Sequence, residues 1–428
     1  MTATVIQSVR ARQILDSRGR PTVEAEVTLA GGARGVASAP AGASRGAAEA
    51  FELRDGDPAH FEGRGVHAAV ANVNGEIARA LAGAEALDQG RVDGRMRELD
   101  GAPQLSRLGG NAVLAVSIAV ARAGAVATGT LLYRRLAELT GTTEPTMPMP
   151  MVNILSGGLH AGRGMDVQDF LVIPVGASGY GEALEWACRV REAAARLCGE
   201  AGITTLLADE GGLSPGFARS TDALDLMVRA FEAAGLRSGE DVAIGLDIAS
   251  SSLVDEAGRY RLERAGTTLS SSEMIDLLED WARRYPIVSV EDGLHEEDWV
   301  YWPALKRRLG HLQLIGDDLF ATQPSRIARG IAEGAANAAL IKINQNGTLS
   351  GTIEAMATAR EGGLATIVSA RSGETEETFI ADLAVGSAAG QIKIGSVRNS
   401  ERLAKYNRLL RIEEDRMPFA GFRRESWA

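Results

Sequence analysis

"PIVSVEDGLHEEDWVYWPALKRRLGHLQLIGDD" (residues 286–318) holds one complete strand–helix–strand unit. Each predicted strand is short and apolar, and each ends in carboxylates, at Glu291 and at Asp317. The segment between the two strands has a helical pattern. Strands of this kind recur through the C-terminal part of the chain, and each carries a charged residue at or near its end: Asp247, Glu291, Asp317, Lys342, Arg371 and Lys393.

These six charged residues recur at intervals that suit a barrel. The intervals are 44, 26, 25, 29 and 22 residues. Units of about 25 residues are typical of strands and helices wound into an α/β barrel, in which the site lies at the carboxyl ends of the strands. Any one carboxylate after a strand could equally cap the next helix. Three anions followed by three cations instead favour a ring around a metal ion and an anionic substrate, because unpaired buried charges are costly.

The predicted ring has the composition of a magnesium site. Asp247, Glu291 and Asp317 offer only oxygen ligands, a set that favours Mg²⁺ over zinc. Lys342 would lie beside the ion, and the charges of the ion and of Lys393 would lower the pKa of Lys342 from about 10.4 and free its amine as a base. A metal ion next to a lysine is an arrangement that removes a proton alpha to a carboxylate.

Two glycine-rich segments and an arginine–serine pair add further candidates. Residues 203–216, ITTLLADEGGLSPG, predict an apolar strand that ends near Glu210, the candidate acid, and two glycines that let the backbone approach a ligand. Glu210 could instead be a solvated loop carboxylate. Arg371 and Ser372 at the mouth of a strand predict a clamp for a phosphate or carboxylate group. Residues 153–170, NILSGGLHAGRGMDVQDF, add His160, Gln168 and Asp169, although a lone histidine is usually structural.

The first part of the chain has a different character. Residues 22–30, TVEAEVTLA, alternate as a half-buried antiparallel strand does. The proline-rich run GTTEPTMPMPM, residues 141–151, predicts a domain boundary near residue 140. Before that boundary, a second strand and two helical patterns are predicted at residues 33–39, 65–82 and 110–139.

Composition argues against several classes of protein. The net charge of −11 over 428 residues argues against a nucleic-acid partner. The first 19 residues lack the apolar region of a signal peptide. Residues 112–121 are apolar but cover only about half a membrane span, so they predict a buried helix. Cys188 and Cys198 lie on one predicted helix, about 15 Å apart, too far to bridge. We therefore expect a cytoplasmic protein without a membrane partner.

A set of longer motifs runs through nearly the whole chain: ILDSRGRPTVEAEV, GASRGAAEAFELRDGD, LGGNAVLAVSIAVA, DEGGLSP, YPIVSVEDGLHEEDW, GDDLFAT, IKINQNGTL, RSGETEET, IADLAVG and SERLAKYNRLLRIEE. Through these motifs the sequence resembles the enolase family. The resemblance implies an N-terminal α+β lid domain (residues 1–140) followed by an eight-stranded (β/α) barrel with one atypical strand direction (residues 141–428). It also implies a homo-oligomer, a dimer or an octamer, that converts 2-phosphoglycerate to phosphoenolpyruvate in glycolysis with two Mg²⁺ ions.

By position, the resemblance also implies a role for each site residue. The first metal ion would be held by the three ring carboxylates, and the second with the help of Ser44 in the lid loop. Lys342 would be the base and Glu210 the acid. His160 would be a further catalytic residue in the substrate pocket. The substrate would be bound by Gln168 and Asp169, by Lys393 at its carboxylate, and by Arg371 with Ser372 at its phosphate.

Several positions depart from the family pattern. Ala370 stands where the family has histidine, and Asp169 where it has glutamate. The site therefore gains room at Ala370, and Arg45 and Arg163 are two possible additional cations that would contact the substrate. Further departures lie in the lid loop (residues 41–46) and in two glycine-rich stretches (156–158 and 161–163). Asn346 stands where the family has an apolar residue.

Three interpretations follow from these departures. The chain is an ordinary enolase that has drifted. Alternatively, it is a specialised paralogue for a larger or more anionic substrate, of the type that forms carboxyphosphonoenolpyruvate in phosphonate biosynthesis. A third interpretation is a non-catalytic binding protein on the enolase scaffold. The intact metal ligands and Lys342 argue against this third interpretation.

Overall fold

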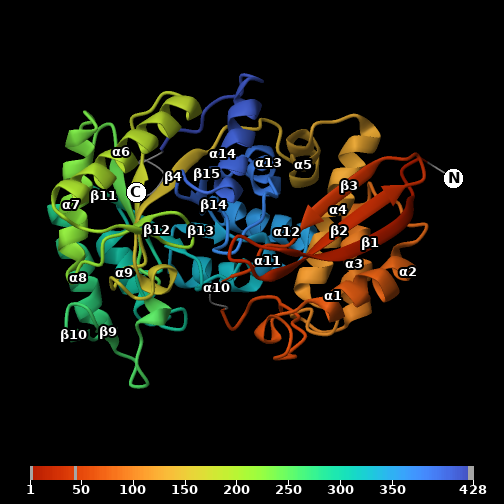
Figure 1. Ribbon diagram of the computed structural model, residues 1–428, viewed down its shortest axis with the longest axis horizontal. Helices are drawn as coiled ribbons and strands as arrows, with labels where there is room; N and C mark the ends of the chain where they lie inside the picture. Colours follow the sequence, from red (N-terminus) through yellow and green to blue (C-terminus); the bar gives the residue numbers. More distant parts are fainter. Residues whose placement is uncertain (1–2, 43–45, 423–428) are drawn as a thin grey trace.

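A computed structural model describes residues 3–42 and 46–422. Its N-terminal domain lies at one end of the molecule and the barrel at the other (Figure 1). The domain begins with an antiparallel sheet in the order β1–β2–β3. α4 packs on β2 and β3, and a Cβ at Gly35 in β3 would collide with the α4 backbone at Ala119. The strands are β1 (Ile6–Leu15), β2 (Pro21–Leu29) and β3 (Arg34–Ser38).

The helices of the N-terminal domain follow the two predicted patterns with differences in detail, and α3 is a helix that was not predicted. The pattern at 65–82 forms a helix that contains one π-helical turn. The pattern at 110–139 splits in two, because Gly129 takes a left-handed conformation, φ 65°, and ends α4. The elements are η1 (Phe61–Gly63), α1 (His67–Asn72), η2 (Val73–Ile77), α2 (Ala78–Leu81), α3 (Gln89–Asp100), α4 (Gly110–Thr128) and α5 (Leu132–Thr140).

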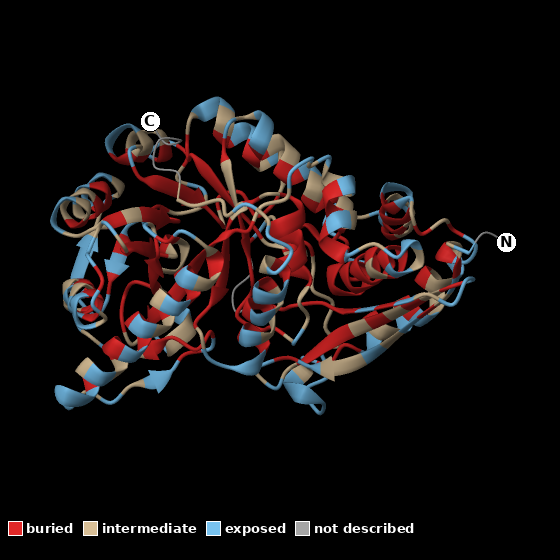
Figure 2. Ribbon diagram, turned by 90° about the horizontal axis from the view of Figure 1, so that it is seen from above, coloured by how far each residue is buried: buried red, intermediate tan, exposed pale blue. Residues whose placement is uncertain are grey.

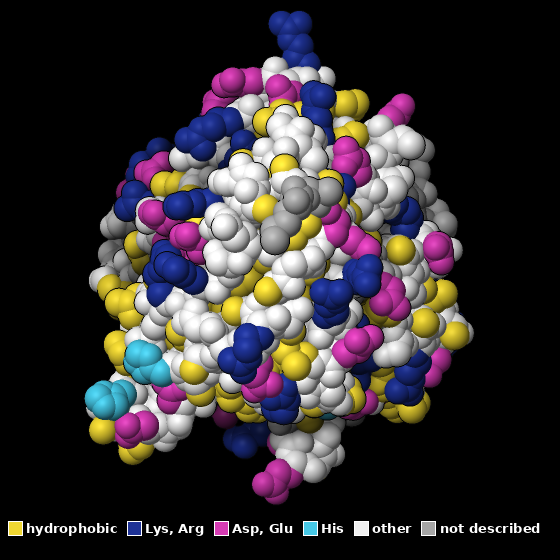
Figure 3. Space-filling model, turned by 90° about the vertical axis from the view of Figure 1, so that its right-hand side faces the viewer, with side chains coloured by type: hydrophobic (Ala, Val, Ile, Leu, Met, Phe, Trp, Pro, Cys, Tyr) yellow, Lys and Arg dark blue, Asp and Glu magenta, His cyan; other side chains and the backbone are white. Residues whose placement is uncertain are grey.

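The buried helix predicted at 112–121 is confirmed. α4 is long and apolar enough to cross a bilayer by length and composition, but 83% of its apolar window is buried inside the protein. It is therefore the core helix of the N-terminal domain. On the outer face of that end of the molecule, positive and negative side chains lie interspersed (Figure 3).

Eight strands close into a barrel, which confirms the predicted fold class. The strand order is β15-β14-β13-β12-β11-β8-β5-β4, and β15 pairs with β4 to close the ring. β5 runs antiparallel to both of its neighbours, the one atypical direction. The strands are β4 (Met149–Ser156), β5 (Asp169–Ile173), β8 (Ala243–Asp247), β11 (Ile287–Glu291), β12 (Gln313–Gly316), β13 (Ala338–Ile341), β14 (Ala365–Ser369) and β15 (Gly390–Gly395).

Helices surround the barrel, with their exposed faces outward and the buried strands inside (Figure 2). Cys188 and Cys198 share α6 and are both free thiols. The helices are α6 (Tyr180–Glu200), α7 (Ser220–Ala233), α8 (Ser271–Arg284), α9 (Trp302–Leu309), α10 (Pro324–Glu333), α11 (Ile343–Asn346), α12 (Leu349–Glu361), α13 (Phe379–Gly386) and α14 (Ser400–Glu413), with short turns η3 (Gly158–Ala161) and η4 (Ser250–Ser252).

Two small hairpins modify the repeating pattern. The hairpin of β9 (Tyr260–Leu262) and β10 (Thr267–Leu269) lies within the long 44-residue interval between the first two charged strand ends. A strand does precede Glu210, as predicted, but it is shorter and more exposed than its apolar sequence indicates. β6 (Leu206–Leu207) is only two residues long and pairs with β7 (Leu213–Ser214), and Leu206 is 71% exposed.

Candidate active site

The six charged residues predicted for the strand ends converge. Asp247 and Glu291 end adjacent strands and are register partners. Lys393 lies within β15, and the other three follow β12, β13 and β14 by one or two residues. A cavity of about 290 Å³ lies at this end of the barrel. Glu291 bonds to Lys393, and the other five residues line the cavity: Asp247, Asp317, Lys342, Arg371 and Lys393.

Lys393 lies between two carboxylates. Its Nζ is 2.7 Å from Asp247 Oδ2 and 2.7 Å from Glu291 Oε2. Although burial works in the opposite direction, the two carboxylates raise the pKa of Lys393 well above its usual value. In turn, despite burial, Lys393 holds the pKa of Asp247 below its usual range. Burial and the Asp247 charge raise the pKa of Glu291 well above its ordinary value.

Lys342 forms an ion pair with Asp317. Burial lowers the pKa of Lys342, but the Asp317 carboxylate outweighs burial and raises that pKa above its usual value. The lowered pKa that we expect for Lys342 therefore depends on the charge of a metal ion bound at the same carboxylates. The lysine backbone is fixed as well, because its N–H donates to Thr322 Oγ1 at 2.9 Å.

The predicted metal ligands fit Mg²⁺. Glu291 Oε1 is buried and finds no hydrogen-bond partner in the part of the chain that the structure describes. Asp247 and Asp317 present carboxylates in the cavity wall beside it. An acceptor oxygen without a donor, grouped with two further carboxylates, matches the hard-oxygen preference of Mg²⁺. These three residues could hold the ion, and so could Asp292, Asp317 and Asp318, whose carboxylate oxygens lie within 4.8 Å of one another.

Two carboxylates that the sequence analysis missed lie beside this group. Asp292 accepts the backbone N–H groups of Asp317 (2.9 Å) and Asp318 (2.8 Å), which fixes the turn after β12. Burial and the neighbouring Asp318 raise the pKa of Asp292 well above its usual range. Burial and the Asp317 charge raise the pKa of Asp318 to about 7. The doublets Glu291-Asp292 and Asp317-Asp318 were the available sequence signal.

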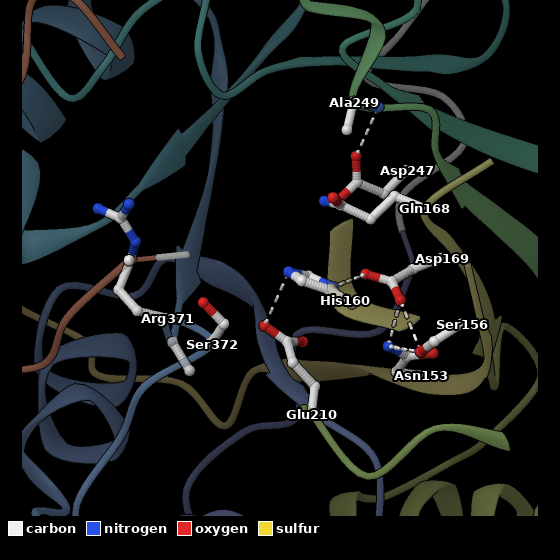
Figure 4. A network of polar contacts seen from close by, with 12 residues as sticks. Asn153, Ser156, His160, Gln168, Asp169, Glu210, Asp247, Ala249, Arg371 and Ser372 are labelled. Carbon is white, nitrogen blue, oxygen red and sulfur yellow. Dashed lines mark hydrogen bonds and ion pairs between the residues drawn. The ribbon is translucent and has the colours of Figure 1, made fainter. Parts of the chain in front are cut away.

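His160 lies between two carboxylates on another side of the cavity (Figure 4). Its Nδ1 is 3.0 Å from Asp169 Oδ2, and its Nε2 is 3.9 Å from Glu210 Oε1. Although burial lowers it, Asp169 and Glu210 raise the pKa of His160 to about 9. Despite burial, His160 lowers the pKa of Glu210. Near neutral pH the imidazole is therefore protonated and Glu210 is ionised.

Asp169 lies behind His160 and does not line the cavity. Its Oδ1 accepts hydrogen bonds from Asn153 Nδ2 at 2.6 Å and from Ser156 Oγ at 2.8 Å. A Cβ at Gly212 would collide with the Ser156 hydroxyl, so this glycine makes room for the network. Asn153 and Ser156 were not predicted, because nothing in their sequence spacing relates them to Asp169. The structure thus favours a role for Asp169 in orienting the imidazole.

Arg371 and Ser372 lie across from His160 and Asp169 (Figure 4). Arg371 Nη1 donates to Glu49 Oε2 and to Asn344 Oδ1, both at 2.9 Å. Although burial works in the opposite direction, Glu49 raises the pKa of Arg371 above its usual value. Glu49 was also missed by the sequence analysis.

The remaining predicted residues have separate positions. Gln168 lines the cavity, and its Nε2 donates to Asp247 Oδ2 at 3.3 Å. Arg163 lines the cavity with an exposed side chain and a left-handed backbone, φ 60°. Ala370 also lines it, almost fully buried. Ser44 and Arg45 lie outside the described residues.

The arrangement combines three chemical capacities around one cavity. Asp247, Glu291 and Asp317 can hold a hard divalent cation, and Lys342 can accept a proton once that cation is in place. The protonated His160 can return a proton. The cations at the cavity suit a small substrate that carries more than one acidic group.

Sequence comparison agrees with the arrangement of the two domains. Residues 6–136 match the profile of "Enolase, N-terminal domain". Residues 144–426 match the profile of "Enolase, C-terminal TIM barrel domain". Together the two matches cover most of the chain.

Proposed function

Because this chain belongs to the enolase family, we propose that it is a Mg²⁺-dependent lyase that removes the proton alpha to a carboxylate and eliminates a hydroxyl group from the next carbon. The proposed reaction converts 2-phosphoglycerate to phosphoenolpyruvate, or a close analogue of the substrate to the corresponding enol product. One observation carries the proposal: Lys342, the carboxylates Asp247 and Asp317, and Arg371 line the same cavity.

Each side chain has a role that follows from its chemistry. Lys342 accepts the proton from C2 of the substrate. Mg²⁺, held by Asp247, Glu291 and Asp317, would supply the positive charge that stabilises the enolate. Arg371 and Ser372 bind the phosphate group. Arginine suits this task because its planar fork of donors matches phosphate oxygens.

The acid is the pair of His160 and Glu210. The hydroxyl group at C3 must gain a proton to leave as water. In this pair the imidazole carries the proton. Burial lowers the pKa of His160, but the flanking Asp169 and Glu210 carboxylates outweigh burial and raise that pKa to about 9. We assign the proton donor to His160, with Glu210 as its partner at 3.9 Å.

The metal requirement tests the proposal most directly. Activity on 2-phosphoglycerate should depend on Mg²⁺ and vanish in excess chelator. Asp247→Ala, Glu291→Ala and Asp317→Ala should each abolish it, because loss of one anionic ligand unbalances the binding of a doubly charged ion. Full turnover in chelator would refute the metal assignment.

A specialised paralogue that forms carboxyphosphonoenolpyruvate is the second candidate. It is favoured by Arg163, which brings an additional cation to the cavity, and by Ala370, which leaves room there. For this candidate, kcat/KM on 2-phosphoglycerate should be at least about a hundredfold below that of an ordinary enolase, because loss of a positioned group typically costs about 10²–10⁴ in rate. Ordinary efficiency would refute it and leave the departures as drift.

A variant that restores the residue of the family tests this candidate further. The variant is Ala370→His, without a change at Asp169. Asp169→Glu would add a methylene to a fully buried site already filled by Asn153 and Ser156, and overpacking of this kind destabilises a protein. For the paralogue, Ala370→His should raise kcat/KM on 2-phosphoglycerate.

Three further parts of the proposal concern the protein as a whole. We propose a homo-oligomer, a cytoplasmic location and, for the first candidate, a place in glycolysis. Light scattering of the purified protein would give the oligomeric state.

A further inference from the structure

The arginine clamp is fixed at its backbone end by the barrel. The Arg371 backbone N–H donates to Glu374 Oε1 at 2.9 Å, and its carbonyl accepts from Arg402 Nη1 at 2.7 Å. These contacts fix where the side chain begins. They leave its long chain of rotatable bonds, and hence the direction of the guanidinium group, to be fixed by other groups.

A carboxylate from the N-terminal domain orients the guanidinium group. Glu49 Oε2 lies 2.9 Å from Arg371 Nη1, and Glu49 Oε1 lies 3.4 Å from Arg371 Nη2. The two side chains are 4% and 6% exposed, so the pair is shielded from solvent. A two-point contact between planar groups fixes direction as well as distance. It links residues that are 322 positions apart in the chain.

Glu49 is itself held from two sides. Its Oε1 accepts the backbone N–H of Gly46 at 3.0 Å and the side-chain amide of Gln345 at 3.4 Å. The same Gln345 Nε2 donates to Asp317 Oδ1 at 3.0 Å. One amide therefore connects the carboxylate that holds the arginine to a carboxylate proposed to hold the metal ion.

We propose that Glu49 is a positioning residue, which holds the Arg371 guanidinium in the direction that receives the acidic group of the substrate. The proposal rests on the proposed function, in which Arg371 binds phosphate. It has a cost in affinity, because a second anion beside the arginine repels a bound phosphate. Glu49 thus trades tighter binding for correct placement, and misplacement of a reacting group by about 1 Å can cost about 10² in rate.

The two effects of Glu49 predict a combination of changes in Glu49→Gln, tighter phosphate binding with a lower kcat, that a general disruption of the structure would not produce. The variant keeps the shape of the side chain and removes its charge. Inorganic phosphate should bind about tenfold more tightly, because the repulsion is gone. kcat on 2-phosphoglycerate should fall about 10- to 100-fold, because the arginine loses its charged two-point contact. A merely structural role predicts weaker phosphate binding instead. A lower melting temperature fits either role, because an amide cannot accept with both of its polar atoms.

The experiment compares Glu49→Gln, Arg371→Lys and the double variant with the wild type. Phosphate affinity is measured by calorimetric titration, kcat and KM by steady-state kinetics, and melting temperature by scanning calorimetry. Because Glu49 acts through Arg371, adding Glu49→Gln to Arg371→Lys should change kcat less than about threefold. The matched control is Glu52→Gln, which removes an equal charge three residues away that pairs with Arg54, outside the cavity. It should behave as the wild type.

Two results with the variants would overturn the proposal. One is phosphate binding by Glu49→Gln that is unchanged or weaker than in the wild type. The other is an additive loss of kcat in the double variant. If the wild type binds phosphate but does not turn over 2-phosphoglycerate, the proposed reaction fails on that substrate, and the phosphate titration alone decides the role of Glu49. A wild type that binds neither ligand would also overturn the proposal, since there would be no clamp to position.

Discussion

The carboxyl end of the barrel and helix α3 of the N-terminal domain bury charge in different ways. At the barrel end, cations lie against carboxylates: Lys393 with Asp247 and Glu291, Lys342 with Asp317, and Arg371 with Glu49. In the N-terminal domain, Asp93 on α3 is fully buried, and within residues 3–42 and 46–422 it forms no ion pair. Its partners are the neutral Gln89 amide and the Ser350 backbone N–H.

The difference distinguishes buried charges that the proposed reaction requires from a buried charge that only destabilises the fold. A buried ion pair rarely stabilises a protein more than well-packed apolar residues would, so several pairs around one cavity indicate a function that requires them. Asp93 does not line the cavity at the barrel end, and it has no ion-pair partner among the described residues. Substitutions at the barrel end should therefore destroy activity, and substitution of Asp93 should improve stability.

The largest expected effect is at Lys342. Lys342→Ala should slow exchange of the substrate's alpha proton in deuterated water by about 10³- to 10⁴-fold, because it removes the proposed base. The measurement is deuterium incorporation into 2-phosphoglycerate, followed by NMR. Glu210→Gln should slow product formation while some exchange survives, because it leaves Lys342 in place.

A lysine on the same barrel provides the control. Lys306 Nζ donates to the Ala336 carbonyl at 2.9 Å, outside the cavity. Lys306→Ala should exchange as the wild type does. Wild-type exchange in Lys342→Ala would assign the base to another residue and would weaken the comparison between the two regions.

The sequence predicts the ring of charges well and its partners poorly. The strand-end residues follow from the repeating strand–helix pattern, which places every carboxyl end at one rim of the barrel. Glu49 and Ser156 belong to no such pattern, and only the folded chain brings them to Arg371 and Asp169. β1 was missed because its buried residues do not alternate regularly along the strand.

The next effect concerns the carboxylate behind the imidazole. Asp169→Asn keeps the size of the side chain and removes the negative charge beside His160. With one flanking carboxylate gone, the pKa of His160 should fall, and kcat should fall about 10- to 100-fold as the protonated acid becomes scarcer. The measurement is the dependence of kcat on pH, whose alkaline limb should move to lower pH.

A nearby aspartate separates this effect from general disruption. Asp166 is also buried, but its carboxylate accepts the backbone N–H groups of Arg264 (2.8 Å) and Ala265 (3.0 Å), away from the imidazole. Asp166→Asn should lower the melting temperature and leave the alkaline limb in place. If the alkaline limb of the kcat–pH profile stays in place in Asp169→Asn, Asp169 does not contribute to the proton donation by His160.

A smaller effect appears in the pH dependence of stability. Despite burial, the flanking carboxylates raise the pKa of His160 to about 9 in the folded protein, from about 6.5 in the unfolded chain. The protonated form therefore stabilises the fold. That contribution, on the order of 3 kcal/mol, is complete below about pH 6.5 and is lost as the pH rises through about 9.

Chemical denaturation of the wild type and of His160→Gln measures this contribution. The free energy of unfolding of the wild type should exceed that of the variant most near pH 6, and the difference should shrink by pH 9. A difference that is equal at both pH values would mean that folding does not raise the pKa of His160. The barrel end would then hold less paired charge than the comparison assumes.

The smallest effect, and the only gain, is expected at Asp93. Burial raises the pKa of Asp93 above its usual value, so ionisation near neutral pH costs stability. Asp93→Asn keeps an oxygen for the Ser350 N–H but replaces the oxygen that accepts from Gln89 Nε2 with a donor. The Gln89 amide must therefore turn so that its buried Oε1, which finds no hydrogen-bond partner among the described residues, accepts from the new donor. We expect about 1 kcal/mol of added stability at pH 7.

The sign of the Asp93 effect depends on pH. The gain should shrink as the pH falls through the raised pKa, because the wild-type carboxyl group is then neutral as well. Asp100→Asn is the matched control, since the Asp100 carboxylate on the same helix accepts the backbone N–H groups of Ala102 (3.1 Å) and Leu108 (2.7 Å). This control should lose stability, because an amide cannot accept with both of its polar atoms. If both variants lose stability equally at pH 7, Asp93 stabilises the fold as its neighbours do. The contrast between charges that the reaction requires and charges that destabilise the fold would then fail in the N-terminal domain.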